Sequence, residues 1–213
     1  MRRNHPPDQP VHVIQRGNNR NPVFFGPQDA RVYLEWLAQA ASAEGVAIHA
    51  YVLMTNHVHL LATGGTPAAL GRCMQSLGIR YTRHVNNAQQ RTGTLWDGPY
   101  RAAAITDARY FLHCCRYIEM NPVRAGLAAT PGAYRWTSYR ANADGQIDGL
   151  VTPHAIYDSL GPDPHARQGA YRALFNDELS DTVLATIRNA TNGCGELSAD
   201  YVRRDRGRPR NAA

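Results

Sequence analysis

The sequence predicts an α+β fold in which helices pack on an antiparallel sheet. Short segments with alternating apolar residues are interleaved with longer segments of helical periodicity, and turn-forming residues separate them. The expected order of elements is β-α-β-β-α-β-α. Within residues 10–105 this order matches a ferredoxin-like unit, an antiparallel sheet with helices on one face.

The first half of the unit has clear local signals. Residues 10–16 (PVHVIQR) alternate as a strand, and the turn-rich segment that follows should end it. A helix is expected over roughly 28–44, with Gly45 placed to end it. Segments 46–54 and 57–62 are separated by a tight connection, so they predict the two strands of a hairpin.

The second half begins at Thr66, a candidate helix cap followed by a first-turn proline. The helix that it starts should continue to about residue 88. A glycine-punctuated loop then leads into a strand near 100–105. Asp107 is placed to cap a third helix, which should stop around Asn121 because a proline follows.

Composition divides the chain into three parts. Residues 1–127 hold the sheet unit and the third helix, whereas residues 128–200 are rich in Gly, Pro and Ala. We expect the second part to form a small helical appendage packed on the core. Its short helices are expected at 154–160, 167–176 and 180–190. Residues 201–213 form a basic tail with little to bury.

The chain is basic, with a formal net charge of +6, which suits a polyanionic partner such as nucleic acid. All 23 basic side chains are arginine, so a Schiff-base lysine and the lysine of a P-loop are both excluded. We therefore expect no nucleotide cofactor. The 4 cysteines form no CxxC pair, which argues against a disulfide framework or a zinc ribbon. They are expected to be buried, reduced thiols.

Apolar runs in the sequence are shorter than the roughly 20 residues that a membrane span needs. The basic N-terminus also lacks the apolar stretch of a secretory signal. We therefore expect a cytoplasmic protein that does not associate with membranes.

A histidine pair lies in the second strand of the expected hairpin. Side chains two residues apart point to the same face of a strand, so His57 and His59 should project together. Val58 and Leu60 should face the other way. Two imidazoles side by side are half of a divalent-metal site. Taken alone, an H-x-H triplet more often represents two unrelated histidines on a half-exposed strand.

The third helix carries a second group of polar residues. His113, Tyr117 and Asn121 follow at i, i+4 and i+8, so they should share one stripe. The neighbouring apolar stripe, which should pack on the sheet, consists of Phe111, Cys114, Cys115 and Ile118. Tyr117 is therefore expected at the edge of the buried face, near the plane where the histidines emerge. A tyrosine in such a place is more often a core residue than a nucleophile.

Together these residues fit one mechanism. A tyrosine hydroxyl is a poor nucleophile unaided, because it stays protonated at neutral pH. A divalent metal on His57, His59 and a third oxygen ligand would polarise a scissile phosphate and orient it for in-line attack. Asn121 could supply that oxygen. Attack by Tyr117 would leave a phosphotyrosine ester and a free sugar hydroxyl, and rejoining would need no ATP because the ester preserves the phosphodiester energy.

Five ordered sequence blocks extend this interpretation to nearly the whole chain. They are HVIQRGNNR at 12–20, AYVLMTNHVHLL at 50–61, RTGTLWDGPYR at 91–101, RYIEMNPVRAGL at 116–127 and WTSYR at 136–140. Through these blocks the sequence resembles the REP-associated tyrosine transposases, within the single-tyrosine HUH transposase superfamily of bacteria. Five blocks in this order are far more specific than an H-x-H triplet.

The resemblance implies a ferredoxin-like HUH fold with Mg²⁺ or Mn²⁺ at His57 and His59. It also implies cleavage and joining of single-stranded DNA through a 5′-phosphotyrosine intermediate, often at the foot of a hairpin in palindromic repeats. The tyrosine of the YI-x-x-NPVRAG block, here Tyr117, looks like the nucleophile. The polar residue one helical turn on, here Asn121, looks like the third metal ligand.

Two further segments are expected to contact DNA. Arg16, Asn18 and Arg20 belong to the first block of the resemblance. In the tail, Arg206 and Arg208 flank a glycine in a sequence that looks like the core of an AT-hook, whose extended arginines enter a narrow minor groove. An ordinary solvated basic tail is about as good an interpretation of so short a match.

Other interpretations stay open at this point. The chain could be a DNA-binding regulator that kept the fold and lost the chemistry. It could also be a structural zinc protein that uses the histidine pair with Cys114 or Cys115. A replication initiator or relaxase shares the HUH chemistry but usually has additional domains. The sequence is compatible with a monomer or a homodimer.

Overall fold

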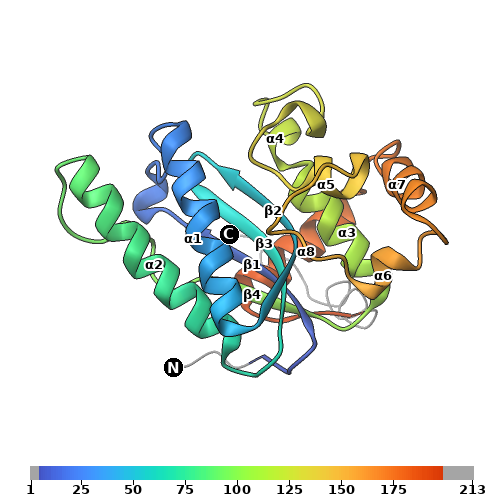
Figure 1. Ribbon diagram of the computed structural model, residues 1–213, viewed down its shortest axis with the longest axis horizontal. Helices are drawn as coiled ribbons and strands as arrows, with labels where there is room; N and C mark the ends of the chain where they lie inside the picture. Colours follow the sequence, from blue (N-terminus) through green and yellow to red (C-terminus); the bar gives the residue numbers. More distant parts are fainter. Residues whose placement is uncertain (1–4, 199–213) are drawn as a thin grey trace, which may run out of the picture.

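The computed structural model describes residues 5–198, which form a five-stranded sheet with helices on both faces (Figure 1). In chain order the elements are β1 (Pro10–Arg16), the 3-10 helix η1 (Asn18–Arg20), α1 (Pro27–Glu44), β2 (Val46–Met54), β3 (His57–Gly64), α2 (Ala69–Ala88), β4 (Arg101–Ile105), α3 (Ala108–Glu119), α4 (Asn121–Arg124), the 3-10 helix η2 (Pro131–Ala133), α5 (Tyr139–Asp144), α6 (Ala155–Asp158), α7 (Pro164–Ala173), α8 (Asp181–Gly193) and β5 (Glu196–Leu197).

β1 lies in the middle of the sheet, whose strand order is β2-β3-β1-β4-β5. It pairs antiparallel with β3 and β4, and β2 pairs antiparallel with β3. This arrangement confirms the ferredoxin-like unit expected within residues 10–105. The short strand β5 joins β4 in parallel, so the complete sheet is mixed rather than antiparallel. The extra strand covers an edge of β4 that would otherwise expose unpaired backbone groups.

Different helices cover the two faces of the sheet. Alternate residues of β1 and β3, such as Val13 and Leu60, are fully buried in the core that α1 and α2 complete. Residues between them, such as Leu61, face the other way and pack with the apolar stripe of α3, including Phe111 and Ile118. Figure 1 shows α1 and α2 on one side of the sheet and α3 and α8 on the other.

Two of the expected helix signals are confirmed and one is wrong. Gly45 follows α1 in the left-handed conformation, with φ of 66°. The side chain of Asp107 accepts a hydrogen bond from the Arg109 N–H at the start of α3. Thr66, however, does not cap α2. That helix begins at Ala69, because the carbonyl of Thr66 accepts the Ala69 N–H in a turn that precedes the helix.

The end of α3 also differs from the expectation. The helix stops at Glu119, before the predicted limit near Asn121. Pro122 has no N–H to donate and suits the first turn of a helix, so a new short helix, α4, begins at Asn121. Asn121 therefore does not share one continuous helix with His113 and Tyr117.

The chain after residue 127 packs closely on the core. Beside β2, the Leu53 N–H donates to the Trp136 carbonyl at 2.9 Å. The helices α6, α7 and α8 correspond to the three expected helical pieces, and α8 contacts β1, β4 and α3. The tail at 201–213, with Arg206 and Arg208, lies outside the described residues.

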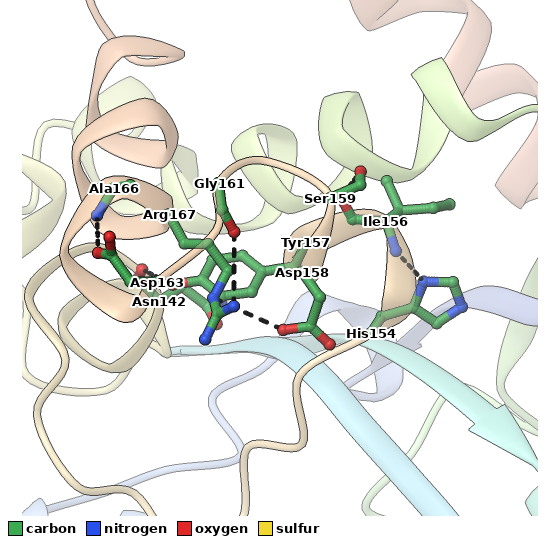
Figure 2. A network of polar contacts seen from close by, with 10 residues as sticks. All are labelled: Asn142, His154, Ile156, Tyr157, Asp158, Ser159, Gly161, Asp163, Ala166 and Arg167. Atoms are coloured by element: carbon green, nitrogen blue, oxygen red, sulfur yellow. Dashed lines mark hydrogen bonds and ion pairs between the residues drawn. The ribbon is translucent and has the colours of Figure 1, made fainter.

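Polar contacts connect the short helices of this region (Figure 2). The Tyr157 hydroxyl of α6 donates to the Asn142 carbonyl of α5 at 2.7 Å. Arg167 of α7 forms an ion pair with Asp158 of α6 at 3.7 Å. The carboxylate of Asp163 caps α7.

Among residues 5–198, none of the helices combines the length and the apolar character that crossing a membrane requires.

Candidate active site

The histidine pair lies on the face of the sheet that α3 covers. His57 and His59 alternate on β3 with Val58 and Leu60, which are buried on the side of α1 and α2. The two imidazole rings have centroids 5.0 Å apart and planes inclined by 84°. The prediction that both histidines project together, away from Val58 and Leu60, is confirmed.

Each of the two rings is held through its Nδ1 atom. The Asn56 amide donates from Nδ2 to the Arg20 carbonyl at 2.9 Å, which leaves Oδ1 to accept from His57 Nδ1 at 2.7 Å. The Nδ1 of His59 meets the Nε2 of His12 at 3.0 Å. Within the described part of the chain, no hydrogen bond reaches Nε2 of His57 or His59. Partners on one ring nitrogen with the other left available are typical of metal-binding histidines.

Burial keeps both imidazoles in their neutral form. It lowers the pKa of His57 to about 4, and the positive charge of Arg16 adds to the effect. It also lowers the pKa of His59 well below its ordinary value, with His12 as the next contributor. Because the neutral imidazole is the form that binds metals, the pair can accept a cation at neutral pH without losing protons first.

α3 places Tyr117 beside this pair. The side chain is 7% exposed, and its ring stands edge-on to His59 with centroids 5.5 Å apart. The same ring is 5.6 Å from the ring of His12. The guanidinium of Arg124 lies over the Tyr117 ring, 4.5 Å from the ring centroid. Tyr117 thus lies near the emerging histidines, as expected.

Two other tyrosines could be considered for the same role. Tyr110 is close to Tyr117 in sequence, and Tyr81 has basic neighbours, but the structure separates both from the histidine pair. Tyr81 lies in the core on the other face of the sheet, where its hydroxyl donates to the Val23 carbonyl at 2.9 Å. Tyr110 is on α3, but its ring contacts His113 at 5.7 Å. Within residues 5–198, Tyr117 is the tyrosine whose ring contacts the histidine pair.

A third ligand drawn from residues 5–198 would be of a type other than His, Cys, Asp or Glu. Across residues 5–198, no three side chains of those types gather as a metal site. Asn121 begins α4, and its side-chain nitrogen is buried without a hydrogen-bond partner. Because a half-turn rotation of the amide exchanges its oxygen and nitrogen, Asn121 can present either atom at this position. The donor types of His57, His59 and Asn121 fit a divalent cation that accepts nitrogen and oxygen ligands.

The loop after β1 is adjacent to the pair. Arg16, the last residue of β1, faces His57 in the strand register, and Asn18 and Arg20 follow in η1. The N–H of the intervening glycine, Gly17, donates to the turn between β2 and β3 at 2.8 Å. A Cβ at Gly17 would lie 2.3 Å from a backbone oxygen, so only glycine permits this close approach. The three expected DNA contacts therefore lie at the histidine end of the sheet.

Three further residues border the site and escape the sequence-based predictions: His12, Arg124 and Thr191. His12 alternates with Val11 and Val13 on β1, so period-two alternation places it on the same face as the pair. Arg124 belongs to the RYIEMNPVRAGL block but follows the helix-breaking proline. No local signal marks Thr191, which lies near the end of α8.

The alternative of a zinc site with Cys114 or Cys115 finds no support among the described residues, which contain no such group of ligands. Both thiols are buried, and burial raises their pKa values, which disfavours the thiolate that zinc requires. The two cysteines instead pack against the sheet within the apolar stripe of α3, as expected. Cys194 is exposed, contrary to the expectation that all the cysteines are buried.

Known proteins resemble this chain in sequence and in fold. The model of the family described as "Transposase IS200 like" matches residues 7–121. A solved REP-associated tyrosine transposase bound to a REP hairpin is similar, with a TM-score of 0.57 and 15% identity, over 72% of this chain and 90% of that chain. A candidate transposase from Deinococcus radiodurans R1 gives a TM-score of 0.39 and 17% identity, over 55% of this chain and 89% of that chain. No curated protein matches the sequence. The first structural likeness confirms the fold.

Proposed function

Because this chain belongs to the family of IS200-like transposases, we propose that it cuts and rejoins single-stranded DNA with Tyr117 as the nucleophile. The observation that carries the proposal is the edge-on placement of Tyr117 against His59, 5.5 Å between ring centroids. A tyrosine ring beside His59, which together with His57 offers neutral imidazoles with available Nε2 atoms, suits metal-assisted attack on a phosphodiester.

The metal-binding residues in this proposal are His57, His59 and Asn121, with Mg²⁺ or Mn²⁺ as the cation. When bound, the cation supplies positive charge that stabilises the phosphate oxygens during attack. The chain itself orients the ligands: Asn56 holds the ring of His57, and His12 holds the ring of His59. Ligands that are held in advance lose little freedom when the site fills.

The chemical step uses the hydroxyl oxygen of Tyr117. This oxygen gives up its proton and attacks phosphorus in line with the 3′ oxygen of the preceding sugar. The bond from phosphorus to that 3′ oxygen breaks, and the oxygen takes up a proton and leaves as a hydroxyl. The 5′ phosphate of the downstream strand is then esterified to Tyr117. Attack on this ester by a 3′ hydroxyl joins the strands and releases the tyrosine.

The proposed substrate is hairpin or palindromic repeat DNA. Support comes from the fold shared with a REP-associated transposase that was solved with a REP hairpin. Arg16, Asn18 and Arg20 are proposed to contact the DNA near the cleaved phosphate, because they border the histidine end of the sheet. Arg206 and Arg208 are proposed to contact DNA outside this centre.

The test of this function is cleavage of a single-stranded oligonucleotide that carries a hairpin. We expect cleavage with Mg²⁺ or Mn²⁺ and none with EDTA. Loss of a residue that only orients a metal ligand lowers metal affinity or activity about 10–100-fold. The double variant His57→Ala, His59→Ala removes two ligands, so its cleavage activity should fall by more than about 100-fold. The exposed His165 on α7 provides the control substitution His165→Ala, which should cleave normally. Full activity in the double variant would contradict the proposal.

Removal of residues 203–213 should weaken DNA binding and flatten its dependence on salt, while cleavage of saturating DNA changes little. This segment contains Arg203, Arg204, Arg206, Arg208 and Arg210. Each lost phosphate contact should lower the slope of log affinity against log salt by about 0.7 on single strands or about 0.9 on duplex. Binding titrations at several salt concentrations measure the slope. A full-length variant with these arginines changed to Gln separates charge from length, and an unchanged slope would show that the tail does not touch DNA.

A further inference from the structure

A chain of hydrogen bonds connects α8 to the histidine pair. The Oγ1 of Thr191 meets His12 Nδ1 at 2.8 Å, and His12 Nε2 meets His59 Nδ1 at 3.0 Å. Thr191 and His12 are separated by 179 positions in the sequence. All three side chains are at most 3% exposed. Solvent therefore has little access to replace any member of this chain.

The donor and acceptor in each of these two hydrogen bonds follow from a third hydrogen bond, which Thr191 makes. The Thr191 hydroxyl donates to the Ile187 carbonyl at 2.8 Å, and a carbonyl has no hydrogen to give. Thr191 Oγ1 must then accept from His12, which places a proton on His12 Nδ1. A neutral imidazole carries one N–H, so His12 Nε2 is an acceptor. The proton in the His12–His59 contact therefore belongs to His59 Nδ1, and His59 Nε2 is left with a lone pair.

We propose that Thr191 and His12 are positioning residues that set the tautomer of His59, so that its Nε2 lone pair is presented to the metal. The proposal rests on the proposed function, because it concerns the same histidine pair. If the order of donors were reversed, His59 would carry its proton on Nε2 and could not ligate a cation through that atom.

Helix α8 lies outside residues 7–121, the part of the chain that the transposase family model matches. In this proposal the C-terminal region supports the metal site indirectly, because its Thr191 sets the tautomer of His59 through His12. His57 needs no such contact, because Asn56 and the Arg20 carbonyl determine its tautomer locally. The two ligands of one cation thus have separate supports, one in the hairpin and one in α8.

The test compares two substitutions at Thr191. Thr191→Val keeps the shape of the side chain and removes the hydroxyl, whereas Thr191→Ser keeps the hydroxyl and removes a methyl group. We expect Thr191→Val to weaken Mn²⁺ binding, measured by calorimetry on the full chain without DNA, by about 10–100-fold. Thr191→Ser should bind Mn²⁺ nearly as the wild type does. A packing role alone predicts the opposite order, because only Ser leaves a cavity.

Nitrogen chemical shifts of the imidazoles in the metal-free protein report the tautomer directly. We expect His59 to carry its proton on Nδ1 in the wild type and in Thr191→Ser, and to populate both tautomers in Thr191→Val. His49 is the internal reference, since its Nδ1 faces the Thr152 carbonyl at 2.7 Å and must be a donor in every variant.

Two results would overturn the proposal. One is a wild-type spectrum in which His59 carries its proton on Nε2, which needs no variant to fold. The other is wild-type Mn²⁺ affinity in Thr191→Val. Failure of the proposed function looks different: the tautomer and the Mn²⁺ affinities would follow Thr191 as expected, but the wild-type protein would not cleave DNA.

Discussion

Replacement of Tyr117 by Phe should abolish the covalent protein–DNA adduct and lower strand cleavage by at least about 10³-fold, the scale seen when a nucleophile is removed. The substitution removes one oxygen and keeps the ring, which stands against His59 and His12 and under Arg124. Unfolding free energy should therefore change by no more than about 1 kcal/mol. DNA binding should persist, because phosphate contacts come from other side chains.

The measurement is a denaturing gel shift of a 3′-labelled oligonucleotide, followed by peptide mapping of the shifted species. Tyr110→Phe is the matched control on the same helix, and Tyr81→Phe is the control on the other face of the sheet. Both should form the adduct. An adduct that persists in Tyr117→Phe, or that maps to Tyr110 or Tyr81, would show that another residue is the nucleophile. No adduct with the wild-type protein would favour a DNA-binding regulator without the chemistry.

Glu119→Ala should lower the unfolding free energy by about 3 kcal/mol or more, because it empties a fully buried polar site. The carboxylate accepts hydrogen bonds from Ser138 at 2.6 Å, Asn142 at 2.9 Å and Tyr171 at 2.8 Å. These partners connect the end of α3, just after Tyr117, to the C-terminal helices. Chemical denaturation measures the loss. Glu119→Gln is the control that keeps the shape and two polar atoms.

The same carboxyl predicts a pH dependence. Burial raises the pKa of Glu119 from 4.5 to about 7, although its three hydrogen bonds act in the opposite direction. Between these values the folded protein keeps a proton that the unfolded chain has lost. The contribution of this proton to the free energy of unfolding is therefore complete below pH 4.5. It is lost as the pH rises through about 7, by about 3 kcal/mol in total.

The buried histidines contribute to stability with the opposite pH dependence, and this contribution must be subtracted. Burial lowers the pKa of His12 to about 3 and the pKa of His49 to about 4, so their contribution is lost as the pH falls. The quantity to follow is thus the difference in unfolding free energy between the wild type and Glu119→Gln. We expect the wild type to lose stability relative to Glu119→Gln as the pH rises from 4.5 to 7. A constant difference would contradict the raised pKa.

Features that depend on near neighbours in sequence could be predicted without the structure. The period of two along a strand puts His57 and His59 on one face, and helical spacing puts Tyr117 at the edge of the apolar stripe of α3. Gly45 and Asp107 act as helix ends through their own backbone and side chain. The order of strands and helices also indicates the ferredoxin-like sheet, and the ordered blocks indicate the transposase family that the family model confirms.

By itself, therefore, the sequence determined which side chains share a face, where several elements end and to which family the chain belongs. Only the tertiary structure decided what holds those side chains. His12 reaches His59 because β1 pairs with β3 in one register, and Thr191 reaches His12 because α8 packs on that face. Such contacts join residues 47 and 179 positions apart, which no local pattern encodes. The tautomer of an imidazole depends on the partner of its other nitrogen, so this part of the site is set by how distant elements pack.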